Sequence, residues 1–107
     1  MAHETTALTG SSGRQYRFNI FPRQTTFQAK GGVYVMAREG AQPNRYEFCF
    51  VGETGDLSKR PFNPEKQECF NRFRVSLIFL IEELDANLRG QIVRDLVQAY
   101  VPGCNTV

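Results

Sequence analysis

The apolar segment VSLIFLI, residues 75–81, constrains the fold of this chain more than any other feature. All of its positions except Ser76 are hydrophobic, so it lacks the apolar–polar alternation of a strand with one face in water. An almost continuous apolar run of this length is typical of a strand that is covered on both faces. The segment therefore predicts an interior strand of a sheet with other elements packed on it.

Three further segments have strand patterns and together predict an antiparallel sheet. Residues 16–21 (YRFNIF) alternate between apolar and polar side chains and end at Pro22. Residues 33–38 (VYVMAR) and 46–51 (YEFCFV) are joined by a short loop rich in turn residues, which favours a hairpin. Alternation along residues 46–51 would point Cys49 away from its aromatic neighbours, as a small buried hydrophobe. The aromatic residues expected on the other face are Tyr46, Phe48 and Phe50.

Helical patterns follow the hairpin. We expect a short helix over residues 56–60 and a second one over residues 65–72, with prolines beside both. Asp85 can cap a last helix by accepting hydrogen bonds from its first free amides. The apolar positions of this last helix recur every four residues, at Leu88, Ile92, Leu96 and Tyr100.

These elements predict one α+β domain over residues 14–107, with a small, mostly antiparallel sheet of three or four strands flanked by helices. A chain of 107 residues with 41% hydrophobic composition suits a single core. Residues 1–13 (MAHETTALTGSSG) are small and polar and have no apolar periodicity. We therefore expect a disordered N-terminal tail there.

Composition also bears on location and partners. The three cysteines are too few and too far apart for a zinc knuckle or a disulfide framework, which favours a reducing, cytoplasmic setting. No apolar run is long enough to cross a bilayer, so no membrane contact is expected. The net charge of +2 neither requires nor excludes a nucleic-acid partner.

Four short motifs occur in a recognisable order along the chain. They are GVY at 32–34, FVG at 50–52, ETGDLSKR at 53–60 and AYVPGCN at 99–105. In this order and spacing they resemble the signature of the GIY-YIG nucleases, which include homing endonucleases and the incision subunit of bacterial nucleotide-excision repair. The resemblance covers about two thirds of the chain. It implies a DNA-cleaving fold that uses Mg²⁺ (magnesium) or another divalent cation.

The resemblance also assigns roles to individual residues. It makes Tyr34 the phenol that helps to activate water and Arg60 the residue that binds and stabilises the phosphate. Gly52 would permit a close turn of the backbone, and Asn105 would border the site. The second tyrosine of the signature is Phe50 here, which keeps the ring and loses the hydroxyl.

Other basic residues are candidate phosphate contacts around this predicted site. Lys59 precedes Arg60, and Arg38 and Arg89 lie on the second strand and the last helix. Arg72 and Arg74 bracket Phe73 and offer a further basic rim, although surface charge is the simpler interpretation of these two residues. A solvated helix end is the equally simple interpretation of Lys59.

The metal ligand of the family has no equivalent in this chain. The resemblance places a glutamate about twelve residues before the terminal asparagine, where this chain has Val93. Valine cannot bind Mg²⁺, which prefers hard oxygen ligands. Asp95 and Gln91 lie roughly 200° around the helix from that position. The remaining candidate carboxylates are Glu82 and Glu83, at the end of the apolar strand.

The sequence thus predicts a divergent GIY-YIG-like domain that interacts with DNA, and leaves open whether it is an enzyme. One alternative is a metal-dependent endonuclease that is active with magnesium or manganese. A second is a non-catalytic nucleic-acid-binding module on the same fold. A third is a protein-interaction domain, which would show a contiguous apolar surface patch.

Overall fold

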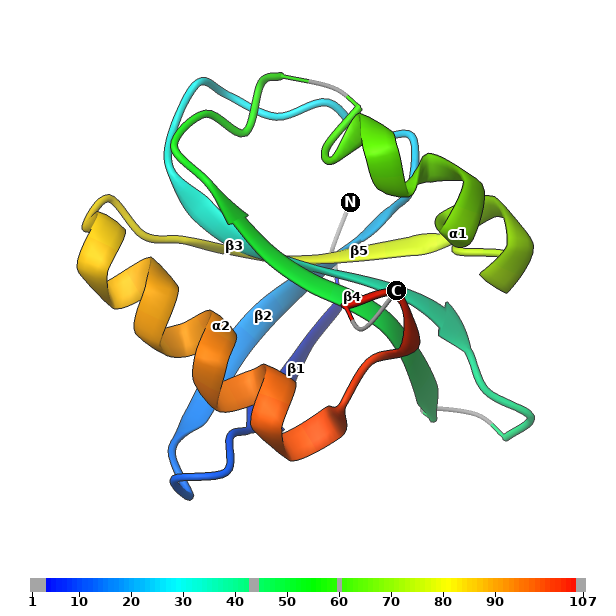
Figure 1. The fold of residues 1–107 in the computed structure, drawn as a ribbon, viewed down its shortest axis with the longest axis horizontal. Coiled ribbons are helices and arrows are strands. Elements are labelled where there is room, and N and C mark those ends of the chain that lie inside the picture. The colour runs from blue at the N-terminus through cyan, green and yellow to red at the C-terminus, as the bar shows by residue number, and fades with distance from the viewer. Residues whose placement is uncertain (1–3, 43–44, 60, 106–107) are drawn as a thin grey trace.

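The computed structural model describes residues 4–42, 45–59 and 61–105, which form a five-stranded antiparallel sheet with a helix on each side (Figure 1). The strand order is β1-β2-β5-β3-β4. The strands are β1 (Glu4–Thr9), β2 (Gln15–Pro22), β3 (Gly32–Glu39), β4 (Tyr46–Thr54) and β5 (Leu77–Glu82). The helices are α1 (Gln67–Phe73), α2 (Ala86–Tyr100) and two 3-10 turns, η1 (Pro64–Lys66) and η2 (Gly103–Asn105).

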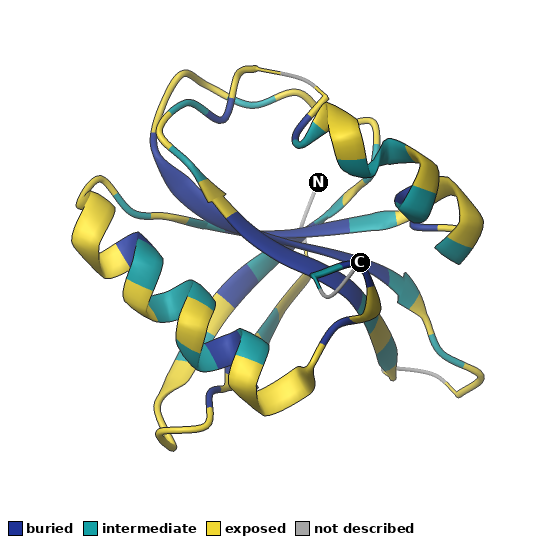
Figure 2. Cartoon of the chain, viewed as in Figure 1, coloured by how far each residue is buried: buried dark blue, intermediate teal, exposed yellow. Residues whose placement is uncertain are grey.

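Strand β5 lies at the centre of the sheet and is buried on both faces, as its continuous apolar run predicts. Ile78 and Leu80 belong to a core that is closed by α1 and the segment before it. Phe79, between them, belongs to a second core that is closed by α2. Figure 2 shows the central strands in dark blue between two helices whose outer sides are yellow. We call these two sides of the sheet the α1 face and the α2 face.

The sheet has one strand more than predicted, because most of the expected tail is ordered. Residues 4–9 form the edge strand β1, which pairs with β2 along its whole length. Only Leu8 of this strand is a buried hydrophobic residue, so its sequence carries no apolar alternation although its backbone pairs with β2. The prediction of a disordered tail is therefore wrong for residues 4–13.

Strand β4 contains a β-bulge that changes which side chains share a face. Met36 pairs with Phe50 whereas Ala37 pairs with Phe48, so Cys49 is the extra residue. Cys49 and Phe50 consequently both lie in the core of the α1 face. Phe48 packs instead against Phe79 on the α2 face, with ring centroids 5.7 Å apart. The predicted common face of Phe48 and Phe50 is therefore wrong.

The helices were predicted with mixed success. Helices α1 and α2 lie close to the expected positions, and the side chain of Asp85 accepts hydrogen bonds from the amides of Asn87 and Leu88. Residues 56–59 form turns and a bend rather than a helix. The carboxylate of Asp56 holds the amide of Ser58 at 2.9 Å, and Leu57 is drawn into the core of the α1 face. This local side-chain bond competes with helix formation.

Candidate functional site

Tyr34, the predicted catalytic phenol, is part of the core of the α1 face. It projects from the middle of β3 and has an exposed fraction of 1%. Its ring stacks on Phe62 with centroids 4.6 Å apart, and it lies 6.2 Å from the ring of Phe50. Its predicted partner Arg60 lies outside the described residues.

Burial raises the pKa of the Tyr34 phenol well above its ordinary value, and the nearby carboxylates of Glu65 and Glu53 raise it further. The phenol therefore keeps its proton at neutral pH. A general base needs a pKa close to the working pH. These surroundings disfavour the role in water activation that the family resemblance implies for Tyr34.

Gly52 serves this aromatic packing and makes no turn. Strand β4 continues through it to Thr54, and Gly52 lies directly opposite Tyr34 on β3. A Cβ atom at position 52 would lie 2.7 Å from the Tyr34 hydroxyl and 2.6 Å from the ring of Phe50. The missing side chain thus makes room for two rings, and the prediction of a tight backbone turn at Gly52 is wrong.

Two of the candidate phosphate contacts are held in internal interactions. Arg89 has an exposed fraction of 8%, donates from Nε to Glu53 at 2.7 Å, and bonds from Nη1 to two backbone carbonyls. Arg38 donates to Glu47 at 2.6 Å and to the carbonyl of Phe73 at 2.8 Å, with its guanidinium over the Phe73 ring. Both residues join elements of the fold, whereas Lys59 is exposed.

Asn105 lies beside the predicted site, where its side chain binds the backbone of β4. Its side chain accepts from the amide of Val51 at 2.8 Å and donates to the carbonyl of the same residue at 2.9 Å. Because β4 is an edge strand, this amide takes the place of a further strand at that point. It lies beside Phe50 and Gly52, which flank Val51 in the sequence.

The residue at the expected metal position and the two remaining candidate carboxylates are all engaged in other contacts. Val93 is a partly buried hydrophobic residue that packs in the core of the α2 face. Glu82 forms an ion pair with Lys30 at 3.7 Å, and Glu83 accepts the amide of Asp85 at 3.1 Å. Val93 thus packs on the face of the sheet opposite the Tyr34 ring.

Asp95 fastens α2 to the turn between β1 and β2. Its carboxylate accepts from the Tyr16 hydroxyl at 2.6 Å, from the Ser12 hydroxyl at 2.7 Å, from the Ser12 amide at 2.8 Å and from the Ser11 hydroxyl at 3.1 Å. The hydrogen bonds from Tyr16 and Ser12 hold the pKa of this carboxyl well below its usual range. Asp95 is therefore a structural anion of the α2 face.

The side chains whose ligand atoms converge in this structure are cysteines rather than carboxylates. Within the described part of the chain, the one group of at least three metal-ligating side chains whose ligand atoms converge consists of Cys49, Cys69 and Cys104. Sulfur is a soft ligand and does not suit Mg²⁺. Glu53, which acts electrostatically on Tyr34, has one carboxylate oxygen bonded to Arg89.

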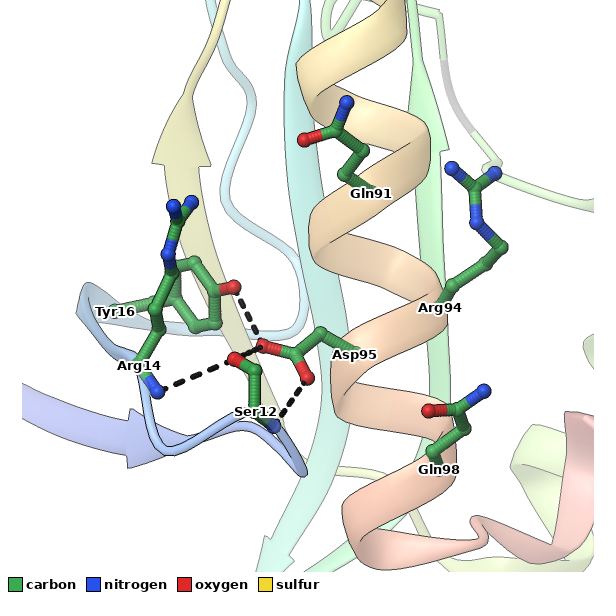
Figure 3. Close-up of a pocket in the computed structure, with 7 residues that line it drawn as sticks. All are labelled: Ser12, Arg14, Tyr16, Gln91, Arg94, Asp95 and Gln98. Atoms are coloured by element: carbon green, nitrogen blue, oxygen red, sulfur yellow. Dashed lines mark hydrogen bonds between the residues drawn. The ribbon is translucent and has the colours of Figure 1, made fainter.

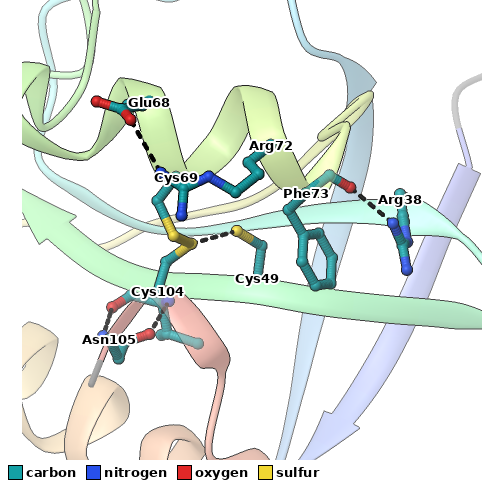
Figure 4. The surroundings of a disulfide bond; sticks show 9 residues. Arg38, Cys49, Glu68, Cys69, Arg72, Phe73, Cys104 and Asn105 are labelled. Carbon is teal, nitrogen blue, oxygen red and sulfur yellow. Dashed lines mark hydrogen bonds and ion pairs between the residues drawn. A yellow bond between two sulfur atoms is a disulfide. The ribbon is translucent and has the colours of Figure 1, made fainter. Parts of the chain in front are cut away.

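The cysteines depart from the prediction in their pairing. Cys69 of α1 and Cys104 of η2 form a disulfide, with Cα atoms 6.1 Å apart (Figure 4). The Sγ atom of Cys49 lies 3.0 Å from that of Cys104. The expectation that the cysteines form no disulfide is therefore wrong, because the fold places the C-terminal turn η2 beside α1, 35 residues earlier in the sequence. Among the described residues, no helix has the length and apolar character to span a membrane.

A groove on the α2 face contains functional candidates that sequence reasoning missed. A cavity of about 410 Å³ lies between α2 and the β1–β2 hairpin (Figure 3). Gln91, Arg94 and Gln98 line it from α2, and Arg14 lines it from the hairpin. In Figure 3, Asp95 points from α2 toward the hairpin, whereas Arg94 and Gln98 extend along the other side of the helix. A second hollow continues it along β2, shares Arg14 with it and adds Arg17. We call these two hollows together the hairpin groove.

The sequence carried a partial signal for this groove. Gln91, Arg94 and Gln98 are spaced by three and four residues, which puts them on one side of a helix. The other wall comes from residues 12–17, most of which belong to the segment expected to be disordered or to its junction with the first predicted strand. Because no hairpin is expected at these residues, the sequence alone does not predict a groove beside Gln91, Arg94 and Gln98.

Comparison with known proteins gave no match to a family model, to a curated protein sequence or to a solved structure. The resemblance to the GIY-YIG nucleases therefore depends on the four motifs alone.

Proposed function

We propose that this chain is a nucleic-acid-binding module that holds a phosphate backbone in the hairpin groove and does not cleave it. The observation that carries this proposal is the pair of exposed arginines in the groove, Arg14 and Arg94. Arg17 also lines the groove, although its Nη1 donates to the hydroxyl of Thr5 at 3.3 Å. Among the described residues, none of the three forms an ion pair with a carboxylate, whereas Arg38, Arg72 and Arg89 all do. Unpaired guanidinium groups suit bidentate contacts to phosphate.

The other groove residues fit the same ligand. Gln91 and Gln98 add side-chain amide groups, which with arginine are usual partners of phosphate oxygens in protein–nucleic acid complexes. The negative charge of Asp95 is surrounded by four hydrogen-bond donors from the hairpin and from Tyr16. Asp95 keeps its negative charge, but its hydrogen bonds come from these groups rather than from arginine. The exposed guanidinium groups of Arg14 and Arg94 therefore stay available to a ligand.

The absence of cleavage in this proposal follows from the state of Tyr34. A buried phenol with a raised pKa is a poor activator of water, and Val93 replaces the glutamate that the family resemblance requires. A GIY-YIG-like ancestry is compatible with binding that has moved to another surface. The metal-dependent endonuclease remains the competing hypothesis, and it predicts turnover with magnesium or manganese.

A protein-interaction role has less support. Within the described part of the chain, the exposed large hydrophobic residues lie at the two ends of α2, with Leu84 and Leu88 at its start and Tyr100 and Val101 at its end. A helix of 15 residues separates these ends by roughly 20 Å. Apolar residues so far apart do not make the contiguous patch that marks a protein interface.

The test is binding of fluorescently labelled single-stranded and duplex DNA and RNA, followed by anisotropy over a range of salt concentrations. We expect salt-sensitive binding that the double variant Arg14→Gln/Arg94→Gln weakens, with the slope of log K against log salt reduced by about 2. The matched control is Arg72→Gln/Arg74→Gln, which removes two charges at the end of α1. The control should bind like the parent protein.

Three results would contradict the proposal. One is no binding to any of these probes at low salt. Another is an equal loss in the groove variant and in the α1 control, which would indicate non-specific attraction. The third is cleavage of the probes with magnesium or manganese, which would restore the endonuclease hypothesis.

A further inference from the structure

Three cysteine sulfurs meet on the α1 face, away from the hairpin groove, and each comes from a different element. Cys49 lies in the bulge of β4, Cys69 in α1 and Cys104 in η2. Their sulfur atoms all lie within 4.8 Å of one another. Cys69 and Cys104 are joined, and Cys49 is the free cysteine (Figure 4). The bulge of β4 leaves Cys49 and Phe50 on the same face of the sheet, within the core that contains this group.

We propose that this cluster is an intramolecular thiol–disulfide exchange site, in which the bridge moves between Cys69–Cys104 and Cys49–Cys104. The Sγ atom of Cys49 lies 3.0 Å from Sγ of Cys104, the sulfur that it would attack. Cys104 is common to both bridges, and Cys49 and Cys69 are the two alternative partners. This inference is independent of the nucleic-acid proposal, because it uses other residues on the other face of the sheet.

The exchange needs no external oxidant or reductant. The thiolate of Cys49 attacks Sγ of Cys104, a new Cys49–Cys104 bond forms, and the Cys69–Cys104 bond breaks with Cys69 leaving as a thiolate. The proton that Cys49 gives up is balanced by the proton that Cys69 takes from solvent. One disulfide and one thiol are present before and after the step.

The three cysteines differ in burial, so the exchange changes how accessible the free thiol is. Cys49 and Cys104 have exposed fractions of 0% and 1%, whereas Cys69 is only partly buried. The exchange therefore transfers the free thiol from the interior to the surface of α1. Burial also raises the pKa of the Cys49 thiol to about 11, with Arg23 and Arg38 acting in the opposite direction. Burial keeps outside reagents away from this thiol, and its raised pKa makes the exchange slow at neutral pH and faster as the pH rises.

The exchange has a structural consequence for α1. In the form observed here, the bridge ties α1 to the C-terminal turn η2 across 35 residues. In the exchanged form, the bridge would tie β4 to η2 and release α1 from it. The thiol at Cys69 would then be able to form a mixed disulfide with a small-molecule disulfide such as oxidised glutathione, or with a protein disulfide.

The test is native alkylation of the purified, unreduced full chain with N-ethylmaleimide, followed by acid quenching and non-reducing peptide mapping. We expect one maleimide per chain on Cys69, together with a Cys49–Cys104 disulfide. The variant Cys49→Ala should take up no maleimide, because its bridge is static. A label found only after denaturation, on Cys49 and with an intact Cys69–Cys104 bridge, would overturn the proposal.

A second variant tests the alternative bridge directly. We expect Cys69→Ala to form a Cys49–Cys104 disulfide when it is treated with oxidised glutathione, with the circular dichroism of the parent protein retained. Two unbridged cysteines in that folded variant would overturn the proposal. So would a parent protein whose three cysteines are all reduced and that binds one equivalent of zinc, because the cluster would then be a thiolate metal site.

Discussion

The two faces of the sheet differ in a way that reverses the expectation from sequence. The α1 face contains the motif residues Tyr34, Phe50 and Gly52, and it is closed by stacked aromatic rings. The α2 face contains few motif residues, yet the hairpin groove with its unpaired arginines lies there. The comparison teaches that residues matching a short motif can serve as core packing, while an exposed polar groove forms in a segment whose sequence has no apparent pattern.

The largest expected effect concerns the disulfide of the α1 face. Closing a loop of 35 residues contributes roughly 3–4 kcal/mol in the chain-entropy model, so Cys104→Ala should lose about that much stability under oxidising conditions. Cys69→Ala should lose less once oxidised, because Cys49 can replace it as the partner of Cys104. Urea unfolding of both variants measures the difference. Equal losses would mean that the bridge has one arrangement only.

Overpacking the aromatic core of the α1 face should have the next largest effect. Gly52→Ala brings a methyl group within 2.6–2.8 Å of Phe50 and Tyr34, and we expect it to reduce the free energy of unfolding by about 1–3 kcal/mol. Gly103→Ala is the matched control, since its Cβ atom would meet no atom within 4 Å. A tolerated Gly52→Ala would show that the rings are loosely packed and that an open site at Tyr34 deserves renewed consideration.

Removal of the anion that fastens the hairpin should have a pH-dependent effect on the α2 face. The pKa of Asp95 is depressed in the folded chain, so its ionisation stabilises the fold above its ordinary pKa and ceases to do so as the pH falls through the folded value. Asp95→Asn should therefore have a lower Tm than the parent protein at pH 7. The difference in Tm should begin to narrow below about pH 4, and a difference independent of pH would contradict this role.

The smallest expected effect separates the two faces by function. Tyr34→Phe removes only a hydroxyl from the closed core, so it should change the affinity for DNA by less than about twofold, or roughly 0.4 kcal/mol. Anisotropy titration beside the Arg14→Gln/Arg94→Gln variant checks this. A large loss in Tyr34→Phe would mean that nucleic acid approaches the α1 face after all.

Local patterns predicted those parts of the fold whose cause is local. The apolar run of β5 and the capped, periodic helix α2 are examples, because burial on both faces and an N-cap leave marks within a few residues. The prediction for α2 was less accurate at the ends of the helix. Residues four positions apart differ in direction by about 40° around the helix axis. Leu88 and Tyr100, at the two ends of the repeat, are therefore exposed. The spacing alone overstated the width of the buried stripe.

Features that depend on contacts between residues far apart in the sequence could not be predicted from local patterns. The edge strand β1 buries one hydrophobic residue, Leu8, and exists because β2 offers it hydrogen bonds. The bulge at Cys49 depends on how β4 pairs with β3. The same holds for the functional candidates: the groove joins Arg14 to a helix some 80 residues later, and the disulfide joins α1 to the C-terminal turn.

The most direct test of the difference between the faces is a titration of the ¹⁵N-labelled protein with a short DNA or RNA oligonucleotide, followed by amide chemical shifts. We predict that the largest shift changes occur in the hairpin groove, at Ser12, Arg14, Gln91, Arg94 and Gln98. Changes concentrated instead around Tyr34 and Gly52, with the groove unaffected, would contradict the assignment of binding to the α2 face.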